Sequence, residues 1–94
     1  MYTLRIEHPV PAYDAWKQAF DSDPLGRKKS GVRRHQVLRL VDDPNYVMID
    51  LEFETANEAE ALLAALRVLW GRVEGTVMSS PRARIVEAVE TEAY

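Results

Sequence analysis

The stretch YVMIDLEF, from Tyr46 to Phe53, has the strict two-residue alternation of a β-strand. On one side of an extended chain its residues are all apolar: Val47, Ile49, Leu51 and Phe53. On the other side two apolar groups accompany two acids: Tyr46, Met48, Asp50 and Glu52. The first side suits a dry core, whereas the second suits neither open water nor a dry interior. We therefore expect this strand to be buried on one face and covered by a partner on the other.

The first half of the chain supplies two more strands and a helix. Residues Tyr2 to His8 alternate like a strand, and the residues of VPAYDAWKQAFDSDP repeat with helical spacing. Pro11 suits the first turn of that helix, and Pro24 should end it. A polar loop then leads to a strand expected from Val32 to Val41. The sequence DDPN, at residues 42–45, predicts a tight turn before the opening stretch.

The second half supplies another helix and a last strand. In TANE, Thr55 and Glu58 have the spacing of a capping box, in which the hydroxyl accepts one backbone N–H and the carboxylate reaches back to another. Apolar residues at intervals of three and four follow, and Gly71 and Gly75 indicate where the helix frays. Residues 83–90 resemble a strand with weaker alternation.

The order of elements is strand, helix, strand, strand, helix, strand. With right-handed crossovers this order favours an α+β, ferredoxin-like βαββαβ fold, in which two helices cover one face of a four-stranded antiparallel sheet. The chain has 94 residues, which is enough for one hydrophobic core, so we expect residues 1–94 to form a single domain.

The other face of the sheet is the predicted dimer interface. A symmetric hairpin would pair Val41 with Tyr46, and in step with it Leu38 with Ile49 and Leu40 with Val47. The last two pairs would then turn their apolar groups toward the helices. The opposite face would then mix charges of both signs with apolar groups, and a second copy of the chain would cover it. The alternative is a solvated monomer face with ion pairs inside the chain. The predicted interface residues are Arg5, Glu7, His35, Arg39, Met48, Asp50 and Glu52.

The layout also resembles a known superfamily. The aromatic helix AYDAWKQAF, the hairpin DDPNYVMIDLEF and the helix TANEAEALLAAL resemble small bacterial proteins of the dimeric α+β barrel superfamily, which includes the antibiotic-biosynthesis monooxygenase-like proteins. The likeness covers nearly the whole chain and contains no catalytic signature. It implies that two ferredoxin-like subunits pack their sheets together into a homodimer. It also implies that any small-molecule pocket lies between sheet and helices.

Four residues are candidates for such a pocket. His8 should end the first strand on the side of the helices, where an imidazole beside aromatic rings can position or exchange a proton. We expect Tyr13, Trp16 and Trp70 to surround the ligand. The alternatives are that His8 only bonds to nearby backbone and that the aromatic residues only fill the core. The protein is then either a small-molecule-binding dimer, such as a cofactor-free oxygenase-like or cyclase-like enzyme, or a non-catalytic accessory or regulatory dimer.

Composition argues against several other functions. With no cysteine and with its two histidines expected on opposite faces of the sheet, the sequence indicates neither a metal site nor a cofactor. The net charge of −3 and the acidic outer face argue against nucleic acid as a partner. No signal peptide or membrane-spanning stretch is indicated, so we expect a cytoplasmic bacterial protein that does not bind membranes. GRKKSGVRR lacks the Lys-Ser/Thr pair of a phosphate loop, and its five cations either hold an anion or form a solvated loop.

Overall fold

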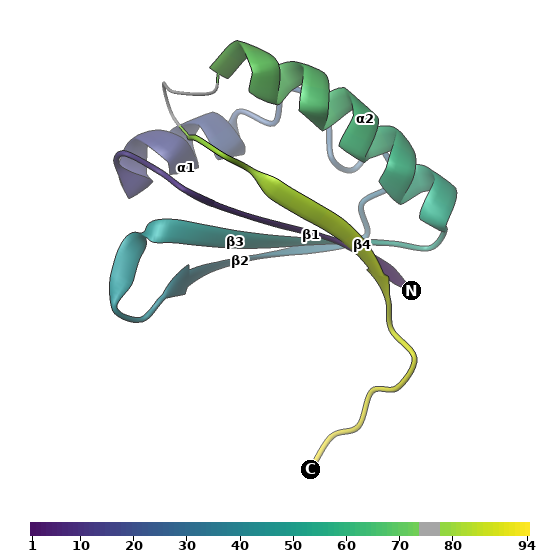
Figure 1. The fold of residues 1–94 in the computed structure, drawn as a ribbon. Coiled ribbons are helices and arrows are strands. Elements are labelled where there is room, and N and C mark those ends of the chain that lie inside the picture. The colour runs from purple at the N-terminus through teal and green to yellow at the C-terminus, as the bar shows by residue number, and fades with distance from the viewer. Residues whose placement is uncertain (74–77) are drawn as a thin grey trace.

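The computed structural model describes residues 1–73 and 78–94. The elements are β1 (Tyr2–Pro9), α1 (Tyr13–Asp21), β2 (Arg34–Leu40), β3 (Asp43–Phe53), α2 (Ala56–Val73) and β4 (Arg82–Glu87). All pairings are antiparallel in the sheet order β2-β3-β1-β4. Both helices lie on one face of the sheet, and within residues 1–73 and 78–94 no element covers the opposite face (Figure 1). The predicted ferredoxin-like fold is confirmed.

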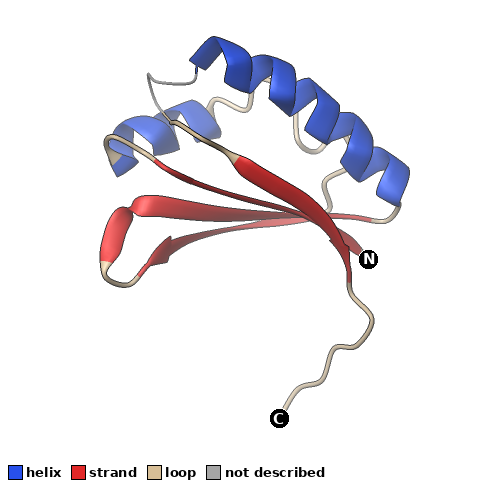
Figure 2. Ribbon diagram, viewed as in Figure 1, coloured by secondary structure: helices blue, strands red, loops and turns tan. Residues whose placement is uncertain are grey.

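The alternation of the two central strands builds the core. The buried positions of β1 are Leu4, Ile6 and His8. In β3 the apolar face predicted from the opening stretch is the buried face, and Val47 and Phe53 are completely buried. The helices, drawn in blue in Figure 2, close this face with Trp16 from α1 and with Leu62 and Trp70 from α2. No helix in the described part of the chain is long and apolar enough to cross a membrane.

The ends of the elements differ from the predicted ones by a few residues. Pro11 precedes the first helix, which begins at Tyr13. The second helix continues through Gly71 to Val73, whereas Gly75 lies outside the described residues. The last strand ends at Glu87, and the chain beyond it runs away from the domain (Figure 1).

The capping box at the start of α2 is present in altered form. The backbone N–H of Glu58 donates to the Thr55 hydroxyl oxygen at 3.2 Å, as predicted. The Glu58 carboxylate, however, accepts from the Thr55 hydroxyl at 3.1 Å and not from its backbone N–H. The Thr55 side chain therefore both accepts and donates, which fixes the first turn of the helix.

The predicted register of the hairpin is wrong. Leu38 lies opposite Met48, and Val37 lies opposite Ile49, which is one residue away from the expected pairing. The chain turns tightly at Val41 and Asp42. Leu40 then pairs with Asp43 whereas Arg39 pairs with Val47, so β3 contains extra residues at this register shift. A one-residue slip turns every side chain of a strand to the opposite face.

The slip exchanges the two faces of β2. His35 and Arg39 lie on the helix side, where His35 meets Phe20 edge to face at 5.4 Å between ring centroids. The Arg39 guanidinium lies 4.4 Å from the centroid of the Tyr13 ring. His35 therefore does not lie beside Glu52 on the outer face as expected, since its partner in β3 is Leu51. Neither residue can belong to an interface on the outer face of the sheet.

Candidate functional site

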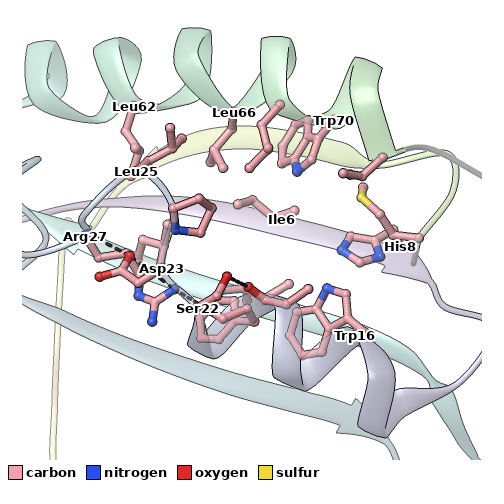
Figure 3. A pocket seen from close by; sticks show the side chains of 18 residues that line it. Ile6, His8, Trp16, Ser22, Asp23, Leu25, Arg27, Leu62, Leu66 and Trp70 are labelled. Carbon is pink, nitrogen blue, oxygen red and sulfur yellow. Dashed lines mark hydrogen bonds and ion pairs between the residues drawn. The ribbon is translucent and has the colours of Figure 1, made fainter. Parts of the chain in front are cut away.

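A cavity of about 310 Å³ lies between the sheet, α1 and α2. Figure 3 shows the side chains that line it, and most of them are aliphatic or aromatic. Ile6 of β1 forms part of its floor, and Leu62, Leu66 and Trp70 of α2 lie across from it. This volume falls at the lower end of the range of small-molecule sites, which are concave and mostly apolar with few polar groups.

His8 supplies the polar group at one end of the cavity. Its side chain is buried because even-numbered residues of β1 face the helices, and it meets Trp16 edge to face at 5.9 Å between ring centroids. The Nδ1 atom lies 3.1 Å from the carbonyl oxygen of Pro9. Since a carbonyl only accepts, Nδ1 carries the proton and Nε2 holds the lone pair. Burial lowers the pKa of His8 below its usual 6.5 and outweighs the hydrogen bond to Pro9, which raises it.

The aromatic residues of α1 follow one another along the cavity wall. Trp16 stacks on Phe20 with ring centroids 5.2 Å apart, and both residues line the cavity. Trp16 is also a member of the core cluster, with 5% of its surface exposed. The two predicted roles of Trp16, as core and as pocket wall, are therefore compatible.

Asp23 and Arg27 form the opposite end of the cavity from His8 (Figure 3). Asp23 has a positive φ of 51° and begins the loop that follows α1. Its carboxylate accepts the backbone N–H of Arg27 at 2.9 Å, which folds the loop back over the end of the helix. The Arg27 guanidinium then lies 3.9 Å from the centroid of the Phe20 ring and donates to the Phe20 carbonyl at 2.8 Å.

The structure brings three of the four predicted pocket residues to one cavity. His8, Trp16 and Trp70 line it. Tyr13 does not line it, although its ring is 5.9 Å from that of Trp16, because it begins α1 and faces Arg39. The ligand-binding role of these residues and the catalytic role of His8 stay predictions.

Sequence reasoning missed Asp23 and Arg27 as cavity residues. The five cations of GRKKSGVRR were a signal for an anion site, but they did not indicate a connection with the pocket. That connection depends on the bend at Asp23 and on the cation–π contact of Arg27, both of which arise only when the loop packs on α1.

The remaining predicted interface residues lie on the outer face of the sheet. Arg5 and Asp50 form a bidentate pair in which Nε and Nη2 each donate at 3.0 Å. Glu7 accepts from the Tyr46 hydroxyl at 2.9 Å, and Glu52 accepts from Arg34. Asp50 and Glu52 of this face are thus paired with arginines inside one chain, and Glu7 is paired with a hydroxyl group. Leu38, brought there by the register shift, joins Met48 as an apolar neighbour.

Comparisons with known proteins place the fold. No protein-family model matches the sequence, and no curated protein matches it either. Among solved structures, SnoaB, a cofactor-independent oxygenase from Streptomyces nogalater, superposes with a TM-score of 0.75 at 18% identity, covering 96% of this chain and 94% of that one. A candidate antibiotic biosynthesis monooxygenase from Deinococcus radiodurans gives a TM-score of 0.79 at 12% identity and covers 100% of this chain and 98% of that one.

A third structure bears on assembly. A dimeric ferredoxin-like protein from an uncultured marine organism gives a TM-score of 0.67 at 14% identity, and the match covers 97% of each chain. The TM-scores of these three structures establish a shared fold, which is a statement about architecture and not about activity. Over nearly its full length, the chain has the ferredoxin-like fold of the antibiotic biosynthesis monooxygenase-like proteins, as the sequence resemblance implied.

Proposed function

We propose that the protein is a homodimer that binds a small, largely apolar aromatic molecule between its sheet and its helices. The observation that carries the proposal is the cavity of about 310 Å³ beside Trp16. A filled core, expected if the protein only had an accessory role, would leave no such space. Aromatic walls favour a flat ligand, because stacked and edge-to-face contacts add to the free energy of burial.

The homodimer is the second part of the proposal. A ferredoxin-like protein with the same fold is dimeric. The outer face of this sheet has paired acids and exposed apolar groups, and both suit a face covered by a second chain. Two of its acids, Asp50 and Glu52, are paired with arginines of the same chain, and Glu7 accepts from the Tyr46 hydroxyl, so covering the face would not leave these carboxylates without partners. Leu38 and Met48 would lose contact with water between these pairs.

The protonation state of His8 supports a catalytic role for this residue within the proposal. A neutral imidazole with a free Nε2 can accept a proton from a phenolic or enolic ligand. An oxygenase without a cofactor must draw its electrons from the substrate, and an electron-rich aromatic anion is a suitable donor. We therefore propose His8 as the general base of such a reaction. In that case His8→Gln should still bind an oxidisable naphthol but consume no dioxygen with it.

The binding proposal is tested by filling the cavity. Ala19 lines the cavity, and Ala19→Leu places three more carbon atoms there. We expect this variant to weaken the binding of 2-naphthalenemethanol at least about tenfold in titration calorimetry, which corresponds to about 1.4 kcal/mol.

Ala64→Leu is the matched control, because Ala64 is an exposed residue of α2. It adds the same atoms to a helix surface and should leave binding unchanged. Unaltered affinity in Ala19→Leu would rule out this cavity as the ligand site.

A further inference from the structure

The apolar cavity shares a wall with a second, polar hollow. That hollow has a volume of about 560 Å³ and lies against the loop between α1 and β2. Asp23 and Arg27 line both spaces, whereas Lys28, Arg33 and Arg34 line only the hollow. A molecule buried in the cavity thus meets, at the end opposite His8, the most basic segment of the chain.

The position of the Arg27 side chain at this shared wall is fixed by contacts inside the chain. Its side chain is 19% exposed, and its Nη1 atom is engaged by the Phe20 carbonyl at 2.8 Å and by Asp23 at 3.6 Å. In the described part of the chain, no acceptor bonds to Nε or Nη2. A guanidinium fixed in this way loses little side-chain entropy when it binds an anion with its remaining N–H groups.

The charged side chains around the hollow have a net charge that one anion would neutralise. Arg33 pairs with Glu54 at 3.1 Å, Arg34 pairs with Glu52, and Arg27 faces Asp23. Among the described residues, Lys28 has no such carboxylate partner, so one positive charge is in excess. This balance suits a single carboxylate and not a polyphosphate.

Asp23 does not favour a cationic ligand instead. Its Oδ1 atom already accepts the Arg27 backbone N–H at 2.9 Å and lies near the guanidinium, so its charge is compensated inside the loop. An ammonium group in this position would face both Arg27 and the unpaired Lys28.

We propose that the ligand is an aromatic monocarboxylate, whose rings fill the cavity and whose carboxylate binds at the shared wall to Arg27 and Lys28. This inference rests on the proposed function, since it assigns the charged group of a ligand held in the same cavity. It also gives the ligand a direction, with the carboxylate at the Arg27 end and the opposite edge of the rings toward His8.

Three probes with one aromatic body and different charges test the proposal. Titration calorimetry should rank 2-naphthoate first, 2-naphthalenemethanol about tenfold weaker, and 2-naphthylmethylammonium weakest. Raising the salt concentration from about 20 mM to about 300 mM should weaken only the binding of the carboxylate, because screening acts on the ion pair. Binding of the alcohol as tight as that of the carboxylate would overturn this inference and leave the proposed function standing. Binding of none of the three would overturn both.

Two substitutions locate the charge recognition. Arg27→Gln should weaken 2-naphthoate about tenfold and leave the alcohol within about twofold. Lys28→Gln changes an exposed side chain, so folding is preserved, and it should weaken the carboxylate about threefold. Arg67→Gln, at an exposed position of α2, is the control and should change nothing. An Arg27→Gln variant that weakens the alcohol as much as the carboxylate, or unchanged carboxylate binding in Lys28→Gln, would overturn the proposal.

Discussion

His8 occupies a position in which a strand pattern places a titratable side chain among apolar residues. Its neighbours in β1 on the same face are Leu4 and Ile6, and the residue is 2% exposed. One hydrogen bond to the Pro9 carbonyl offsets part of the cost of removing the imidazole from water. Because burial acts mainly against the charged form, this site keeps the imidazole neutral and available as a proton acceptor.

The lowered pKa of His8 makes stability depend on pH. Above pH 6.5 the imidazole is neutral in both the folded and the unfolded chain, so it contributes no pH dependence there. Below pH 6.5 the unfolded chain takes up the proton first, and the free energy of unfolding falls until the lowered folded pKa is reached. We expect His8→Gln to remove this part of the decrease.

Urea unfolding between pH 7.5 and pH 5 measures the effect. The control is His35→Gln, which changes an exposed histidine and leaves His8 in place, so this variant should retain the decrease. Parallel curves for the natural sequence and His8→Gln over this range would contradict the assigned burial effect.

At the scale of elements, the loop between α1 and β2 packs against the start of α2. Gly31 has a φ of +101°, a conformation that L side chains rarely adopt. A Cβ atom at this position would lie 2.5 Å from Glu58 Oε2, the residue that completes the capping box. The positive φ therefore favours glycine at this position, and an added methyl group would also have to displace the Glu58 carboxylate from its place against the loop.

Two glycine substitutions should change stability in opposite directions. Gly31→Ala should lower the free energy of unfolding by about 2 kcal/mol, chiefly through backbone strain and to a smaller extent through displacement of the Glu58 carboxylate. Gly71→Ala should raise it by about 0.5–1 kcal/mol, since Gly71 lies inside α2 with nothing within 4 Å of the added methyl group.

Chemical denaturation of both variants provides the measurement. Combining Gly31→Ala with Glu58→Ala should remove the steric part of the loss and retain the backbone part. Equal stability of Gly31→Ala and Gly71→Ala would show that neither the φ value nor the contact matters.

At the scale of the whole molecule, the two faces of the sheet differ in what covers them. The helices cover one face, and the other lies open in a single chain (Figure 1). On that open face, Leu38 is 39% exposed beside the bidentate pair of Arg5 and Asp50. The proposed dimer would place a second copy there, and its contacts would be the same on both chains.

Leu38→Lys should therefore dissociate the dimer. A lysine covered without a partner carries a large desolvation cost, so we expect the dissociation constant to rise at least about tenfold. Light scattering at micromolar concentration should give twice the 10.7 kDa chain mass for the natural sequence and a lower mass for the variant.

Val68→Lys is the matched control, because Val68 is 60% exposed on α2, away from the open face of the sheet. It should stay dimeric. A mass of 10.7 kDa for the natural sequence would exclude the homodimer, and an unchanged dimer in Leu38→Lys would move the interface elsewhere.

The sequence by itself determined which segments form strands and helices and which face of each central element is buried. Val47 to Phe53 alternate with period two, and the residues of α1 and α2 repeat with helical period, so burial of one face follows from local spacing. The capping contact of Thr55 and Glu58 was predictable for the same reason, since its partners are three residues apart.

Only the tertiary structure decided the register of β2 and the shape of the cavity. The register depends on how β3 accommodates the extra residues after Asp43, and a single-residue difference moved His35 and Arg39 to the helix side. The cavity depends on how α1, α2 and the loop of Arg27 fit together at a distance in sequence. Local periodicity says which side of an element is apolar, but the space left between packed elements is set by contacts among all of them.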